Sequence, residues 1–257
     1  MGRYLISFVA LVLLALVGAT PLMAAKFKHL NTLYGDGAGK MLKAPEGVAC
    51  SSTTLVVADS GNERLVRYQI TEQGIKGGTV IPLTGRVPLV TQVDEAGAVY
   101  VLDRKKRELV RIDSAGTKAA TLSPRGVPGR KQVVPRSFRI AGERIYLLDV
   151  HGDRILVFDT AGNYQAQIPL PSSGRFFSDL AVSAGGAIYL LDSVAGALYR
   201  AAPQETSFSL FSSGLKNYMN FPTSLVVNRS GEIYLSDQYG SGVAQLAAGA
   251  QAGDGTC

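Results

Sequence analysis

The sequence has few of the residues on which many small exported proteins and zinc enzymes depend. It contains two cysteines, two histidines and no tryptophan in 257 residues. Cys50 and Cys257 allow no disulfide framework and no cysteine zinc site, although an oxidising compartment would permit them to pair. With only His29 and His151 present, a multi-histidine zinc site is excluded. Stability must therefore come from a hydrophobic core, which 46% apolar residues can supply.

Long apolar runs are also absent, apart from one at the N-terminus. Arg3 precedes the run LISFVALVLLALVG, and small residues follow up to Ala25. This pattern is typical of a signal peptide over residues 1–25, and the run is shorter than the roughly 20 residues that a spanning helix needs. An uncleaved membrane anchor is the alternative. We predict an exported protein, periplasmic or extracellular, with a domain over residues 26–257 and no membrane span after cleavage.

Five segments of the chain resemble one another. They are LVVADSGNERLVRY from Leu55, VYVLDRKKRELVRI from Val99, IYLLDVHGDRILVF from Ile145, IYLLDSVAGALYRA from Ile188 and IYLSDQYGSGVAQL from Ile233. Each has an aspartate at the same place, at spacings of 44, 46, 43 and 45 residues: Asp59, Asp103, Asp149, Asp192 and Asp237. Upstream, a proline precedes a short apolar strand in four copies, and a phenylalanine takes its place in the fourth: Pro45, Pro88, Pro135, Phe177 and Pro222.

Apolar residues alternate with period 2 inside each copy, and Gly, Asp, Asn and Ser separate the runs. Four strands in each repeat of about 40 to 45 residues predict an all-β chain, a β-propeller of four-stranded blades. No window after the N-terminal run favours an amphipathic helix.

The two ends of the domain determine how the ring closes. The fifth copy supplies three strands and then runs out in Ala and Gly, whereas residues 27–37 form a spare strand at the other end. Two arrangements follow: the N-terminal strand completes the fifth blade, or the five repeats belong to an incomplete six-bladed ring.

The repeat resembles the NHL family, and APEGVACSSTTLVVADSGNERLVRYQI, residues 44–70, is its best copy. The last two copies lack the arginine found at Arg64 and Arg154. Tryptophan–aspartate repeats are disfavoured because the chain has no tryptophan. The resemblance implies a propeller that is usually six-bladed, with relatives that bind RNA or act as a zinc-dependent lyase, and with similar folds that are calcium lactonases.

The repeated aspartates allow two interpretations. They could form a ring of metal-binding carboxylates, or each could accept hydrogen bonds from the amides of the turn that follows its strand. Because equivalent positions on different blades lie far apart, we interpret them as turn caps.

A basic cluster interrupts the second repeat. Residues 104–139 hold eleven Lys and Arg against Glu108 and Asp113, a local charge of +9 in a chain of net charge +6. We expect its members to share one face of the second and third blades, and we predict that they bind a partner: Arg104, Lys105, Lys106, Arg107, Arg125, Arg130, Lys131 and Arg136. A solvated, solubilising surface is the alternative.

The partners that suit such a patch outside the cytoplasm are an acidic protein, an anionic glycan or a lipid headgroup. Nucleic acid is disfavoured by the signal peptide, and no aromatic platform is evident beside the patch.

Catalysis is the second class of function to weigh. Glu46 and Asp179 fall near the starts of inner strands and could bind a hard cation such as calcium at the central channel. The equivalent positions Leu89, Ser137 and Thr223 make a thin ligand shell. We therefore predict a non-enzymatic binding scaffold without cofactor or metal, with a divalent-metal, lactonase-like hydrolase or lyase as the alternative.

Overall fold

Five antiparallel sheets account for nearly all regular structure in the computed structural model. It describes residue 29 and residues 31–129, 132–171, 175–240 and 242–246. The predicted signal peptide, residues 1–25, lies outside the described residues, as do Cys257, Arg130 and Lys131. All the strands belong to one compact unit, residues 30–255.

The sheets follow one another along the chain, one for each repeat. The first sheet contains β1 (Pro45–Cys50), β2 (Thr54–Asp59), β3 (Arg64–Thr71) and β4 (Gly74–Pro82). The second contains β5 (Pro88–Val93), β6 (Val99–Asp103), β7 (Glu108–Ile112) and β8 (Ala119–Leu122). The third contains β9 (Pro135–Ala141), β10 (Arg144–Asp149), β11 (Arg154–Asp159) and β12 (Tyr164–Pro169). The fourth contains β13 (Phe177–Val182), β14 (Ile188–Asp192), β15 (Ala197–Ala201) and β16 (Ser209–Ser212). The fifth contains β17 (Pro222–Val227), β18 (Ile233–Asp237) and β19 (Val243–Leu246).

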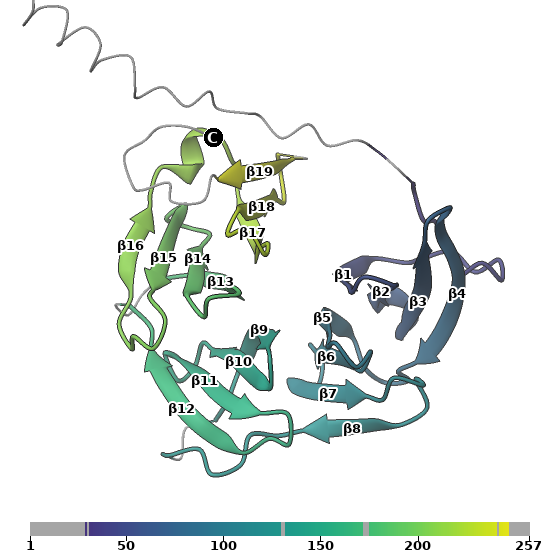
Figure 1. The fold of residues 1–257 in the computed structure, drawn as a ribbon, viewed down its shortest axis with the longest axis horizontal. Helices are drawn as coiled ribbons and strands as arrows, with labels where there is room; N and C mark the ends of the chain where they lie inside the picture. Colours follow the sequence, from purple (N-terminus) through teal and green to yellow (C-terminus); the bar gives the residue numbers. More distant parts are fainter. Residues whose placement is uncertain (1–28, 30, 130–131, 172–174, 241, 247–257) are drawn as a thin grey trace, which may run out of the picture. The chain divides into compact units, whose positions relative to one another are not determined.

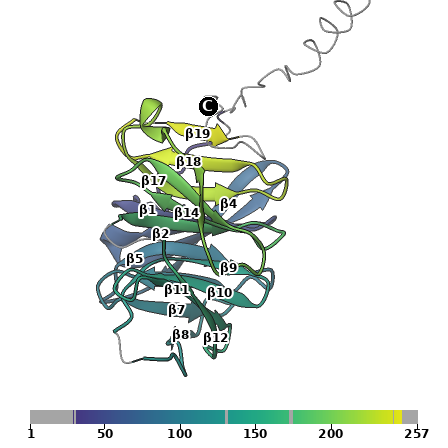
Figure 2. The same cartoon turned by 90° about the vertical axis from the view of Figure 1, so that its left-hand side faces the viewer.

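Within the unit the sheets are arranged as the blades of a β-propeller, which confirms the predicted fold class (Figure 1). The first strand of each blade lies innermost, and neighbouring blades contact each other through these inner strands. The outermost strands β8 and β12 lie next to each other in both views (Figures 1 and 2). Helix is limited to two 3-10 turns in the described residues, η1 (Ser60–Asn62) and η2 (Leu215–Asn217), and no helix there is long and apolar enough to cross a membrane.

The core lies between neighbouring blades rather than in one central cluster. On β10, Ile145 and Leu147 pack toward the second blade, whereas Tyr146 and Leu148 pack toward the fourth. Successive side chains of a strand point to opposite faces of its sheet, so a strand between two blades needs apolar residues at every position. This explains why runs such as IYLLD are apolar throughout.

Four of the five repeated aspartates accept hydrogen bonds from turn amides, as predicted, whereas Asp59 accepts from the Asn62 side chain and the Lys43 amide. Asp103 accepts hydrogen bonds at one oxygen from the amides of Lys105 and Val87, both at 3.0 Å, and at the other from the Arg86 guanidinium at 3.1 Å. Asp237 accepts from the amides of Phe221 at 2.9 Å and Tyr239 at 3.1 Å. Asp103, Asp149 and Asp237 thus tie the turn after the second strand to the chain that enters the same blade.

The N-terminal segment differs from the closure that the sequence analysis considered. Residues 27, 28 and 30 lie outside the described part, but Leu33 and Leu42 pack on the first blade, and the Tyr68 hydroxyl donates to the Gly35 carbonyl at 2.8 Å. The fifth sheet has three strands among the described residues. Burial of these leucines and an ion pair with Arg64 hold residues 33–42 on the first blade, so this stretch adds no strand to the fifth.

That ion pair joins two acidic groups to one buried arginine. The Arg64 guanidinium contacts Asp36 at 2.5 Å and Asp59 at 2.6 Å. The hydrogen bond from Arg64 lowers the pKa of Asp36 below its usual 3.8. Burial raises the pKa of Asp59, but hydrogen bonds from the Lys43 amide, Asn62 and Arg64 outweigh it and lower that pKa as well.

These shifts predict how stability depends on pH. Because both carboxyls have a lower pKa folded than unfolded, their stabilisation is fully present above the unfolded value and is lost as the pH falls through the folded one. We expect the free energy of unfolding to decline below roughly pH 5, and Asp36→Asn to make that decline shallower. Urea unfolding at a series of pH values measures this decline in the native protein and the variant. An equally steep decline in the variant would contradict a contribution of Asp36 to it.

Candidate functional site

The turns after the second strands and the connections between blades lie on the same face of the propeller. The amide of the first turn residue donates to the carbonyl of the residue before the inner strand of the same blade. These pairs are Arg104 and Val87 at 2.9 Å, Val150 and Val134 at 3.2 Å, Ser193 and Phe176 at 3.1 Å, and Gln238 and Phe221 at 3.0 Å. We call the surface that carries these turns and residues the connection face.

The basic turn of the second blade lies on this face. Arg104, Lys105, Lys106 and Arg107 form the whole turn between β6 and β7, and all four are exposed. The Arg104 guanidinium pairs with the Glu46 carboxylate at the start of β1. No ion pair joins Lys105, Lys106 or Arg107 to another described residue. The turn therefore presents three uncompensated positive charges.

The other predicted basic residues are spread more widely than expected. The backbone of Arg125 forms an isolated β-bridge with that of Asn163, and the Arg125 guanidinium donates to the Ala161 carbonyl at 2.5 Å. Arg125 therefore lies beside the turn between β11 and β12. Arg136 is exposed on β9, near the start of an inner strand. Arg130 and Lys131 lie outside the described residues. The expectation that the described members share one face holds for 104–107 and Arg136 but not for Arg125, because the outer strands carry the chain to the rim between blades.

Aromatic rings lie beside Arg136, which the sequence analysis did not expect. The Arg136 guanidinium stacks over the Phe176 ring, 4.5 Å from its centroid. The Phe221 ring follows at 6.4 Å from Phe176, and Tyr239 at 6.0 Å from Phe221. We call Phe176, Phe221 and Tyr239 the aromatic row. These rings come from three separate segments, so no contiguous motif in the sequence indicated them.

The two carboxylates of the metal hypothesis have other roles. Asp179 is buried and accepts hydrogen bonds from Ser137 at 2.6 Å, Arg139 at 2.7 Å and the Leu225 amide at 2.9 Å. It therefore links the inner strands of three blades, and a guanidinium already neutralises it. Glu46 pairs with Arg104. Among the residues that the structure describes, no group of three or more His, Cys, Asp or Glu side chains gathers as a metal site requires.

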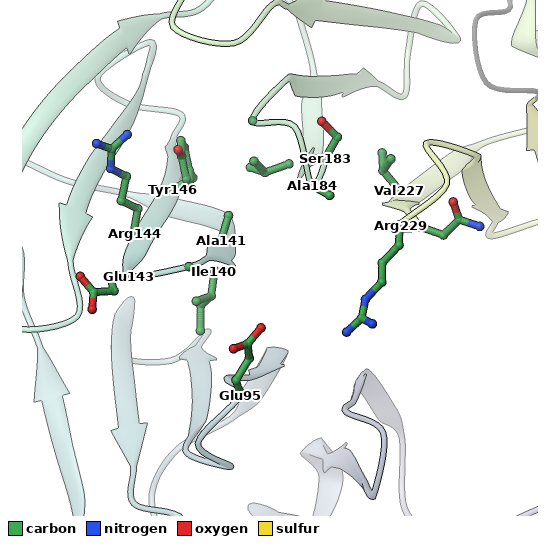
Figure 3. Close-up of a pocket in the computed structure, with 14 residues that line it drawn as sticks. Glu95, Ile140, Ala141, Glu143, Arg144, Tyr146, Ser183, Ala184, Val227 and Arg229 are labelled. Atoms are coloured by element: carbon green, nitrogen blue, oxygen red, sulfur yellow. The ribbon is translucent and has the colours of Figure 1, made fainter.

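A pocket of about 650 Å³ opens at the turns between first and second strands, which the sequence analysis did not identify. Figure 3 shows Glu95, from the turn after β5, and Arg229, from the turn after β17, extending into the opening from different blades. Neither forms an ion pair with another described residue. Among the described residues that line the pocket there is no cysteine or histidine, and none of the described members of the predicted partner-binding set is there.

Comparisons with known proteins support the fold. No protein-family model matches the sequence, and no curated protein matches it either. A gluconolactonase structure from Xanthomonas campestris is 20% identical with a TM-score of 0.61, covering 82% of this chain and 75% of that one. A nidogen/laminin complex structure is 16% identical with a TM-score of 0.61, covering 80% and 77%. Virginiamycin B lyase from Staphylococcus aureus is 14% identical with a TM-score of 0.58, covering 82% and 75%.

Similarity at this level of identity shows the β-propeller fold alone. The similar structures include enzymes and a component of a protein complex, so the fold by itself assigns neither catalysis nor binding. They support a propeller without assigning the chain to the NHL family.

Proposed function

We propose that the protein is an exported, non-enzymatic propeller scaffold that binds an acidic partner protein through its connection face. The N-terminal apolar run and the small residues up to Ala25 support export. Proteins that the repeats resemble include binding proteins as well as enzymes, so the choice of binding is argued from the charge of one turn. Arg104, Lys105, Lys106 and Arg107 lie at the centre of the proposed surface.

The uncompensated charge of the turn at 104–107 carries this proposal. Lys105, Lys106 and Arg107 are exposed and pair with no acidic group in the described residues. The fold of the blade does not require a basic residue in this turn. The same turn in the fourth blade is Ser193 to Gly196, which has no charge and the same backbone contact to the inner strand. Concentrated positive charge speeds the encounter with an acidic surface and makes the rate sensitive to salt.

Charge reversal tests this role. We expect Lys105→Glu combined with Lys106→Glu to weaken binding of the acidic partner by about tenfold or more at low salt, because attraction becomes repulsion. Both side chains are exposed, so each change should alter the free energy of unfolding by about 0.5 kcal/mol or less. Partners are captured from an extract of the source's cell envelope, identified, purified and titrated against each variant at two salt concentrations.

A matched control separates this turn from general surface charge. Lys76→Glu combined with Lys118→Glu makes the same change in net charge at two exposed lysines on β4 and in the turn before β8. The proposal requires that this control bind almost as tightly as the native protein. Equal weakening in both double variants would mean that net charge, and not the turn at 104–107, governs binding.

A further inference from the structure

The aromatic row is a preformed, exposed feature of the connection face. Tyr239 is 70% exposed and Phe176 is 39% exposed, while Phe221 between them is partly buried. The rings of neighbouring members are tilted by 46° and 47°, so they form a stepped surface and not a flat stack. Single exposed apolar residues are ordinary, whereas adjoining aromatic rings capped by an arginine resemble the composition of protein interfaces.

Backbone hydrogen bonds hold the row in place. The Phe176 and Phe221 carbonyls accept from the amides of Ser193 and Gln238, and Asp237 accepts from the amides of Phe221 and Tyr239. The Ser193 hydroxyl also donates to the Pro222 carbonyl at 2.5 Å, which joins the fourth blade to the fifth. The backbone that carries the rings therefore needs little ordering on binding, and aromatic side chains bury a large area with few rotatable bonds.

An arginine lies against one end of the row. The Arg136 guanidinium covers the Phe176 ring, 4.5 Å from its centroid. Arg175 directly precedes Phe176 in the chain, and its guanidinium lies 4.9 Å from the centroid of the Tyr199 ring and 3.7 Å from Asp192. The acidic group at the row itself, Asp237, is occupied by turn amides, and these bonds outweigh burial and lower its pKa. The row is therefore apolar along its length and carries a basic group at its Phe176 end.

We infer that the aromatic row anchors apolar side chains of an acidic, extended peptide segment in the partner protein, while the basic turn at 104–107 attracts its carboxylates. This rests on the proposed function and names the chemistry of the partner. An anionic glycan or lipid headgroup would use the charges alone. Single-stranded nucleic acid would need exposed ring faces on which successive bases stack. Rings tilted by 46° and 47° to one another are better suited to contact side chains that insert between them.

The test uses random peptides displayed on phage and selected on the purified protein. We expect the selected peptides to combine Asp or Glu with aromatic, Leu or Pro residues. Synthetic copies should bind Tyr239→Ala and Phe176→Ala about tenfold or more weakly than the native protein, since central aromatic residues carry most of the energy of such interfaces. Tyr34→Ala removes a ring that is 67% exposed on the N-terminal segment and is the matched control. Thermal unfolding confirms that each variant is folded, and Tyr239→Phe should bind nearly as well as the native protein.

Two polyanions distinguish failure of this inference from failure of the proposed function. Heparin and a single-stranded oligonucleotide should each bind through charge, weakened by Lys105→Glu with Lys106→Glu and unchanged by truncating the rings. Peptides that bind the truncated variants as tightly as the native protein would overturn the aromatic anchor and leave the basic face standing. Peptides that depend on the rings but not on Lys105 and Lys106 would support the anchor and overturn the role of the basic turn. Oligonucleotide binding that requires Tyr239 or Phe176 would overturn the peptide assignment.

Discussion

Replacing Asp179 by alanine is expected to lower the free energy of unfolding by about 3–5 kcal/mol. The carboxylate accepts from Ser137 of the third blade, from Arg139 of the same blade and from the Leu225 amide of the fifth. Its loss leaves the mostly buried Arg139 guanidinium without its counter-charge and leaves a buried amide unpaired. Urea unfolding of the native and variant proteins measures the difference.

A double-mutant cycle separates this ion pair from simple loss of volume. Arg139→Met alone should also be strongly destabilising, while the Asp179→Ala, Arg139→Met double variant should recover part of the combined loss, because no buried charge is then left unpaired. Strictly additive losses would contradict the proposed coupling. Calcium is added in parallel: a rise in melting temperature with calcium that Asp179→Asn abolishes would restore the metal-binding hypothesis for this residue.

Replacing Arg64 by methionine is expected to cost about 3–5 kcal/mol and to release the N-terminal segment from the first blade. Arg64 is 4% exposed, contacts both Asp36 and Asp59, and donates to the Lys40 carbonyl at 3.2 Å. Methionine keeps much of the volume but leaves Asp59, which is fully buried, without its cation. Urea unfolding gives the loss of stability, and limited proteolysis within residues 33–43 reports release of the segment.

Arg154 provides the matched comparison, because it occupies the same place in the third blade. It contacts one carboxylate, Asp149 at 3.0 Å, and no N-terminal segment. Arg154→Met should therefore cost less than Arg64→Met and leave proteolysis of residues 33–43 unchanged. Equal cleavage in both variants would show that Arg64 does not hold the segment.

The functional proposals depend on contacts of different kinds. The turn at 104–107 could be recognised in the sequence because four basic residues are adjacent there. The aromatic row could not, since Phe221 and Tyr239 meet through the pairing of strands in the fifth blade and Phe176 joins them only when the fourth and fifth blades pack. One signal was available in the sequence. The residue before the first strand of the repeat is aromatic in the last two copies, whereas it is valine in the second and third, at Val87 and Val134.

The sequence by itself determined the blades, because strands and turns are set by local patterns. Short apolar runs separated by Gly, Asp, Asn and Ser indicated the strands, although the second strand of a blade is apolar at nearly every position and not alternating, and the aspartate that ends each second strand marked a turn. Only the tertiary structure decided which blade holds the N-terminal segment, why Asp179 is neutralised, and where Arg125 lies. Those outcomes depend on contacts between residues distant in the chain. The apolar runs are similar in every blade, so they do not specify which side chains meet across two of them.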